Sequence, residues 1–171
     1  MPRALALRDL GILAATLALW SADGALREQG GALAIVVAIA TGVMTALSGY
    51  LAHEWGHLLG ARLSKSRVSL PDSPLSVFLF RFDTGLNVRS QFLTMSMGGF
   101  VASGLVAALL LATLPMHALS TWTALVLTAL GLLATAILEI PPFWRVFRGA
   151  PLPRGGPAYV TTRNEGVTPL L

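Results

Sequence analysis

The sequence contains no cysteine and few charged residues. Only 12% of its 171 residues are charged, whereas soluble domains carry about 25%. The absence of cysteine excludes disulfide bonds and thiolate metal sites, so any metal must be bound by histidine and carboxylate side chains. Because 54% of the residues are hydrophobic, too little polar surface remains to cover a globule in water. The sequence predicts a protein of the lipid bilayer, and nothing in it points to a nucleic-acid partner.

Long apolar stretches divide the chain. Four of them approach the roughly 20 residues that a helix needs to cross the hydrocarbon core, and they cover residues 4–22, 31–60, 91–115 and 119–141. Arg8 and Asp9 interrupt the first, whose unbroken part also has the length of a signal-peptide core. We expect an all-α membrane protein of about four transmembrane helices. Residues 1–148 form a single domain in this interpretation, and a Pro/Gly-rich tail follows at 149–171.

The segment between the second and third stretches differs from its neighbours. Residues 61–90 are too many for a simple turn, and Pro71, Pro74 and Gly85 flank or follow an apolar run at 77–82. This pattern predicts a short hairpin or re-entrant segment at the membrane surface. An amphipathic interfacial segment with no catalytic part is the alternative.

Positive charges lie almost entirely on one side of the predicted spans. Eleven of the twelve lysines and arginines fall before the unbroken part of the first span, between the second and third, or after the fourth, and only Arg27 falls elsewhere. Short cytoplasmic loops carry such an excess. Both termini and the 61–90 segment are therefore predicted to be cytoplasmic.

A candidate metal-binding and catalytic motif lies at the end of the second apolar stretch. His53, Glu54 and His57 form a His-Glu-x-x-His pattern, in which helical spacing places both imidazoles on one face. Two histidines with an open position suit zinc, which lowers the pKa of a bound water to about 7 while the glutamate acts as general base. Polar groups in lipid are costly without partners, which favours a ligand over histidines that only bond to neighbours.

A zinc site needs a third protein ligand, and helix lengths point to Glu139. At 1.5 Å per residue, His53 and His57 lie roughly 32 to 38 Å from the outer end of their helix, and Glu139 lies roughly 30 Å along its own. These depths match. The alternative is a carboxylate at the helix end that pairs with interfacial arginines. Asp72 and Asp83, in the 61–90 segment, are the other candidate ligands.

Two segments resemble a known family. Residues 51–62, Leu-Ala-His-Glu-Trp-Gly-His-Leu-Leu-Gly-Ala-Arg, resemble the active-site helix of the site-2 protease family, the intramembrane zinc metalloproteases. Residues 95–104 are similar to the family's Ala-Gly-Pro-x-x-Asn helix, with Phe100 in place of proline and Ser103 in place of asparagine. The resemblance covers about residues 31–145, in the order of the three core helices of the family.

The third motif of the family is different in this chain. Where the family has a zinc-binding Asp after an Asn-x-x-Pro stretch, alignment of the prolines places Trp144. Either Glu139 takes over this role from an earlier position in the helix, or the chain is a divergent relative that binds metal poorly. The family's asparagine, which would help to stabilise the oxyanion, also has no match.

The resemblance implies an intramembrane zinc metalloprotease. Zn²⁺ would be held by His53, His57 and Glu139, Glu54 would be the general base, and Gly98 with Gly99 would leave space for an extended substrate. The substrate would be a transmembrane segment of another membrane protein, with its unwound strand paired to the 61–90 segment.

Two other classes of function remain open at this stage. One is a catalytically inactive membrane scaffold or binding protein of the same fold, and the other is a metal sensor or transporter. The intact Glu54 opposes a scaffold, and a single polar cluster at one depth opposes a transport path. The identity of the substrate and the oligomeric state do not follow from the sequence.

Overall fold

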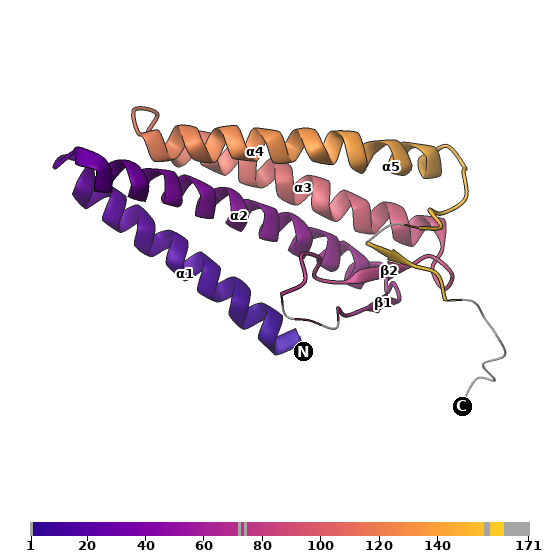
Figure 1. The fold of residues 1–171 in the computed structure, drawn as a ribbon. Helices are drawn as coiled ribbons and strands as arrows, with labels where there is room; N and C mark the ends of the chain where they lie inside the picture. The colour runs from indigo at the N-terminus through magenta and orange to yellow at the C-terminus, as the bar shows by residue number, and fades with distance from the viewer. Residues whose placement is uncertain (1, 72, 74, 156–157, 163–171) are drawn as a thin grey trace.

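The computed structural model contains four long helices, one short helix and a small sheet (Figure 1). It describes residues 2–71, 73, 75–155 and 158–162. The helices are α1 (Pro2–Arg27), α2 (Gly31–Leu63), α3 (Arg89–Thr113), α4 (Leu119–Leu138) and α5 (Ile140–Phe147). The strands are β1 (Val68–Ser69), β2 (Arg81–Asp83) and β3 (Tyr159–Val160).

The helices confirm the expected all-α membrane fold. Four helical segments are long and apolar enough to cross a membrane, namely Arg3–Arg27, Gly31–Leu63, Arg89–Thr113 and Leu119–Phe147. Large aliphatic side chains such as Leu17, Leu105 and Leu133 are more than half exposed. Such side chains are stable when lipid surrounds them. The chain is therefore a multi-pass membrane protein.

The last predicted span is divided. Residues 119–141 were expected to form one helix, but α4 ends at Leu138 and α5 begins at Ile140, with Glu139 between them. Pro141 and Pro142 stand in the first turn of α5 and have no N–H to continue the hydrogen bonds of α4. The break places Glu139 at the junction of the two helices. The other helices differ only at their ends, since α1 continues past residue 22 and α2 past residue 60.

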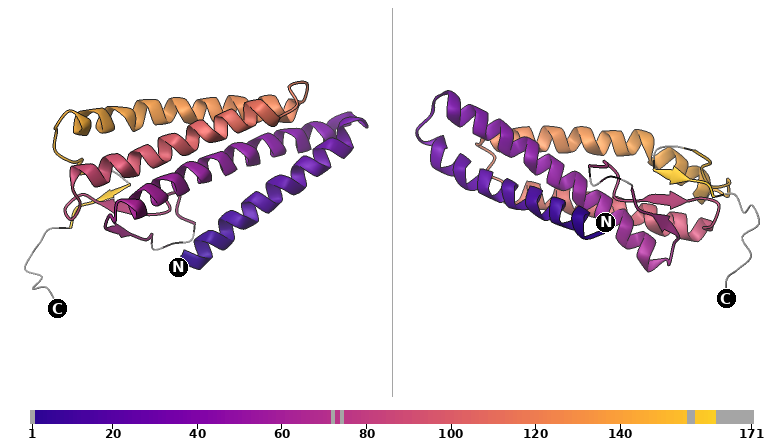
Figure 2. Two further views of the ribbon diagram at one scale, coloured as in Figure 1. Left: turned by 180° about the vertical axis from the view of Figure 1, so that it is seen from behind. Right: turned by 60° about the horizontal axis from the view of Figure 1, so that its bottom comes forward.

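Helix α2 lies between α1 on one side and α3 and α4 on the other, as the left view of Figure 2 shows. Glycines allow α2 to lie close to α3 and α4. A Cβ added to Gly42 would lie 2.4 Å from Cβ of Thr123 in α4, and one added to Gly56 would lie 2.5 Å from the carbonyl oxygen of Gly98 in α3. Membrane helices can approach each other this closely when small residues lie at their contacts.

The sheet confirms the hairpin predicted between the second and third spans. Strand β2 is central, with β1 antiparallel to it (Val68 opposite Phe82) and β3 parallel to it (Phe82 opposite Tyr159). The apolar residues 77–79 form bends rather than a strand. Strand β3 was not predicted within the Pro/Gly-rich tail. Residues 156–157 and 163–171 of that tail lie outside the described residues.

A buried apolar cluster joins the sheet to the helices. It is formed by residues from the start of α1, the end of α2, the sheet, the start of α3 and α5, and its members include Leu5, Leu58, Phe82, Phe92 and Val146. Phe92 is fully buried and Phe82 is 1% exposed. The cluster fixes the sheet at the end of the bundle where α2 carries its histidines.

Candidate metal centre

Helix α2 presents His53 and His57 one turn apart on the same face. Their rings are T-shaped with centroids 4.4 Å apart, and their Nε2 atoms are 3.0 Å apart. His53 is only 5% exposed. The expected helical placement of the motif is therefore present, with both Nε2 atoms directed to one point.

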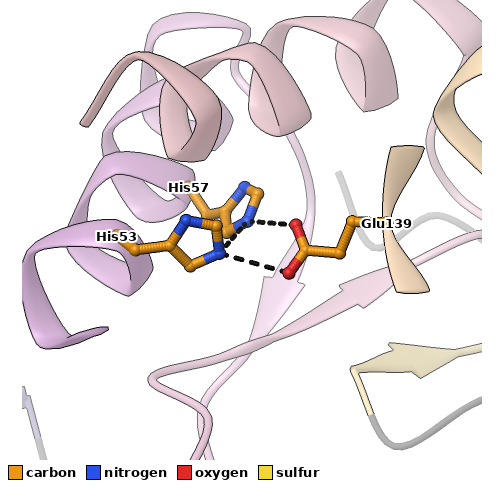
Figure 3. Close-up of side chains that lie close together, drawn as sticks. All are labelled: His53, His57 and Glu139. Carbon is orange, nitrogen blue, oxygen red and sulfur yellow. Dashed lines mark hydrogen bonds and ion pairs between the residues drawn. The ribbon is translucent and has the colours of Figure 1, made fainter. Parts of the chain in front are cut away.

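Glu139 reaches this point from the junction of α4 and α5 (Figure 3). Its Oε1 lies 3.2 Å from Nε2 of His53, and its Oε2 lies 3.2 Å from Nε2 of His57. One ligand atom from each of the three residues lies within 4.8 Å of the others. The group could hold a metal ion, and it is the one such cluster found among the residues that the structure describes.

The size and chemistry of the group suit zinc. Tetrahedral zinc with bonds of about 2.1 Å separates its ligand atoms by about 3.4 Å, and the atoms here are 3.0 to 3.2 Å apart. Two imidazoles and a carboxylate are also the protein ligands of many catalytic zinc sites, which keep a fourth position open.

Helix α3 orients both imidazoles through their other nitrogen. Nδ1 of His57 lies 3.0 Å from the carbonyl oxygen of Met95, and Nδ1 of His53 lies 3.1 Å from that of Gly99 and 2.8 Å from Oγ of Ser103. A carbonyl oxygen only accepts, so each Nδ1 donates its proton to it. In neutral histidine the Nε2 atom then carries a lone pair that faces the cluster, as in ligands of metal ions.

Glu54 lies beside the cluster without belonging to it. Its side chain is buried, and its Oε2 accepts a 3.3 Å hydrogen bond from the backbone N–H of Leu79. Leu79 belongs to the segment between β1 and β2, which therefore positions the carboxylate. Glu54 therefore lies next to the candidate metal ligands and is not one of them.

Two cavities meet at the cluster. The cavity on the sheet side has a volume of about 320 Å³ and is lined by apolar residues, including Phe78, Phe80 and Met95, together with Glu54, His57 and Glu139. The cavity between α2, α3 and α4 has a volume of about 370 Å³ and is lined by His53, Glu54 and Glu139 and by many small residues, among them Ala46, Gly49, Gly131 and Ala134. Glu54 and Glu139 line both cavities.

Gly98 and Gly99 were expected to leave space for a substrate. A Cβ on Gly98 would lie 2.2 Å from the carbonyl oxygen of Gly56, and one on Gly99 would lie 2.3 Å from Cε1 of His57. The space beside Gly98 is thus filled by the backbone of α2, and the space beside Gly99 by an imidazole. Both glycines allow α3 to contact the motif, while their contact with a substrate stays a prediction.

Asp83, one of the two alternative ligands, does not join the cluster. Asp72 lies outside the described residues. The carboxylate of Asp83 instead accepts hydrogen bonds from the backbone N–H groups of Gly85 (2.9 Å) and Leu86 (3.2 Å) and from Thr162. Burial alone would raise the pKa of Asp83, but these hydrogen bonds, led by that from the Thr162 hydroxyl, lower it below its usual value.

Two residues at the site were not predicted. Ser103 was noted only as a replacement for the family's asparagine, yet it contacts His53. Tyr159 of β3 lines the sheet-side cavity, and its burial, together with the negative charge of Glu139, raises the pKa of Tyr159 to about 12. No pattern in the sequence links this tyrosine to the histidine motif. No protein-family model, curated protein or solved structure matches this chain significantly.

Proposed function

We propose that this chain is an intramembrane zinc metalloprotease, similar to the site-2 protease family, that hydrolyses a peptide bond in or near a transmembrane segment of another membrane protein. One observation carries the proposal. His53, His57 and Glu139 converge on one point, and Glu54 lies beside them where two cavities meet.

The contacts within the cluster favour a metal over hydrogen bonds alone. With both Nδ1 atoms donating to carbonyl oxygens, neutral histidines would direct lone pairs at each other across 3.0 Å and at a carboxylate across 3.2 Å. Protonation of both rings would bring two positive charges together in a low-dielectric environment. A single divalent cation between the three side chains satisfies all of them. Zinc fits this donor set best, since no thiolate is available and the ligands are nitrogen and oxygen.

Different residues of the chain would then perform different parts of the hydrolysis. Zinc held by His53, His57 and Glu139 would supply a Lewis acid for a water molecule and for the scissile carbonyl. Glu54 accepts the proton of the attacking water and transfers it to the leaving amine. The N–H of Leu79 holds one carboxylate oxygen of Glu54 in place during both transfers.

The cavities suit an extended segment that comes from the bilayer. The cavity of about 370 Å³ lies between transmembrane helices, whereas the cavity of about 320 Å³ lies under the sheet. A peptide that passes from one to the other crosses the side chains of Glu54 and Glu139. A helical segment is too wide for such volumes, so the substrate must unwind before its carbonyl reaches the site.

The sheet end of the molecule is assigned to the cytoplasm in this proposal. Arginines and lysines concentrate at that end, as the positive-inside rule requires. At the opposite end, Arg27 is neutralised by Asp23, with a contact of 2.5 Å. Both termini would then be cytoplasmic, and cleavage would occur near the cytoplasmic face.

Glu54→Gln provides the test of proteolysis. Membranes of cells that express the wild type or Glu54→Gln would be compared by mass spectrometry of membrane-protein fragments, with Glu28→Gln as an exposed carboxylate control. We expect fragments that end within a transmembrane segment in the wild type and Glu28→Gln only. Identical fragments from wild type and Glu54→Gln would contradict proteolysis and favour an inactive scaffold of the same fold.

A further inference from the structure

Strand β3 occupies the second edge of β2. The N–H of Phe82 donates to the carbonyl oxygen of Ala158 at 3.0 Å, and the N–H of Thr84 donates to that of Val160 at 2.8 Å. Strand β1 already pairs with the other edge. Both edges of β2 are thus paired, one of them with the tail of the same chain.

The same tail segment reaches the candidate active site. Ala158 and Tyr159 line the sheet-side cavity together with Glu54, His57 and Glu139. The ring of Tyr159 also packs on Phe92, with centroids 6.1 Å apart. The tail therefore forms one boundary of the space in which a substrate peptide would lie.

Side chains after β3 complete its attachment. The hydroxyl of Thr162 donates to Asp83, and the Oγ1 atoms of Thr84 and Thr161 are 2.9 Å apart. Gly85 allows this approach, because a Cβ there would lie 2.4 Å from the carbonyl oxygen of Thr162. These contacts involve the end of β2 and the loop after it rather than the metal cluster, so they can be changed separately from it.

We propose that residues 158–162 form a strap that fills the peptide-pairing edge beside the metal cluster and must leave before a substrate strand can bind there. An extended peptide gains main-chain hydrogen bonds only from an open strand edge, and the strap uses those of Phe82 and Thr84. The inference rests on the proposed function, since it identifies what controls access to the same site.

The attachment is suited to reversible release. Strand β3 has two residues, and Thr161 and Thr162 beyond it are exposed. Apart from the half-buried ring of Tyr159, the strap is held mainly by hydrogen bonds, and such short segments open locally without unfolding the rest of a protein. A permanent wall of the cavity is the competing interpretation, and it requires no opening.

A reversible covalent lock separates these interpretations. The chain has no cysteine, so Thr84→Cys with Thr161→Cys introduces the single possible disulfide at side chains that already touch. The full-length protein would be loaded with zinc in detergent, and zinc removal by EDTA, which is too highly charged to enter from the apolar side, would be followed. We expect removal to be about tenfold slower in the oxidised than in the reduced protein, because opening is blocked. Equal rates would overturn the strap and favour a permanent wall.

A second experiment needs neither metal nor proteolysis. Ser96 is buried and lines the cavity, so Ser96→Cys reports access through its rate of reaction with a water-soluble thiol reagent. Gly85→Ala displaces Thr162, whereas Gly155→Ala is the same change where nothing lies within 4 Å. We expect labelling to be about tenfold faster with Gly85→Ala than with Gly155→Ala, as local opening predicts. Equal labelling would contradict the strap.

The two failures are distinguishable. A wild-type chain that binds no zinc contradicts the proposed function, and the labelling rates of Ser96→Cys still decide whether the tail covers the cavity. A chain that binds zinc and loses it at the same rate in the locked and unlocked states contradicts the strap alone.

Discussion

Backbone carbonyls of α3 determine which nitrogen of each histidine faces the cluster. Because Met95 and Gly99 accept from the Nδ1 atoms, both Nε2 atoms are left for a metal. Ser103 adds a second contact to His53 alone, at 2.8 Å. The two imidazoles therefore differ in how firmly they are oriented, although the motif itself is symmetric.

Replacement of Ser103 tests this difference. We expect Ser103→Ala to weaken zinc binding about tenfold, the lower end of the effect of removing a partner of a metal ligand, because Gly99 still holds the ring. Competition titration with a zinc-binding dye would measure the change. Ser90→Ala, in an exposed position at the start of α3, is the matched control. Equal affinity of Ser103→Ala and wild type would show that Ser103 does not orient His53.

At the residue scale, the sequence predicted what depends on helical spacing. The placement of His53 and His57 follows from a period of 3.6 residues, and the depth of Glu139 follows from helix length. The role of Ser103 could not be predicted, because it depends on how α3 is rotated against α2. The contacts of the glycines could not be fully predicted for the same reason, because they depend on how the helices pack. Gly42, Gly49, Gly98 and Gly99 lie at close helix contacts, but a Cβ added to Gly104 would meet nothing within 4 Å.

Helix α1 is joined to α2 by polar contacts. Nε1 of Trp55 donates to Asp9 at 2.8 Å, Thr16 Oγ1 lies 2.9 Å from Oγ of Ser48, and Nε1 of Trp20 donates to Thr45 at 2.9 Å. Asp9, which made the first span the weakest in the sequence, is the acceptor for the tryptophan within the metal motif. The charge that interrupts the apolar run therefore serves the contact between these two helices.

The pH dependence of the sheet follows from Asp83. Its folded pKa lies below the ordinary value of about 3.9, so the ionised carboxylate stabilises the end of β2 fully above about pH 4. This stabilisation is lost as the pH falls through the folded pKa. We expect the amides of Phe82 and Thr84, which donate to β3, to exchange more slowly in the wild type than in Asp83→Asn at pH 6.

Hydrogen-exchange protection factors, corrected for intrinsic rates, would measure this effect. The difference between wild type and Asp83→Asn should shrink below about pH 4, as linkage requires. Glu28→Gln serves as the control, because Glu28 is exposed in the connection to α2. A difference that stays constant as the pH falls would show that the charge of Asp83 does not hold the strand.

At the element scale, the sequence predicted the helices more completely than the strands. Four helices are visible as apolar runs, and the hairpin is indicated by its prolines and by Gly85. Strand β3 is two residues long and pairs with a strand far away in the chain, so no alternation of polar and apolar residues announces it. The division at Glu139 was also not predicted, although Pro141 and Pro142 follow it closely.

At the scale of the whole molecule, the sheet and most of the positively charged residues lie at the same end. The start of α1, the hairpin and β3 lie at the same end of the bundle, and the α1–α2 and α3–α4 connections lie at the other (Figure 1). This arrangement agrees with the distribution of lysine and arginine that predicted the orientation. Among the described residues, the helices of the bundle supply His53, His57 and Glu139, so the bundle itself positions the site.

Single cysteines in this cysteine-free chain would test the orientation. We expect Leu75→Cys, in the hairpin segment, to react with a membrane-impermeant thiol reagent only after cells are permeabilised. Gln29→Cys, in the connection between α1 and α2, should react in intact cells. Both positions are exposed, which makes them a matched pair. The reverse pattern would place the sheet outside the cytoplasm.

The central claim is that the three converging side chains bind zinc. The most direct measurement is the zinc content, by elemental analysis, of the detergent-purified wild type beside His57→Ala, Glu139→Gln and Glu54→Gln. The account predicts nearly one zinc per chain in the wild type and in Glu54→Gln, and a loss of zinc in both His57→Ala and Glu139→Gln. A wild type that is purified without chelators and contains no zinc would contradict it.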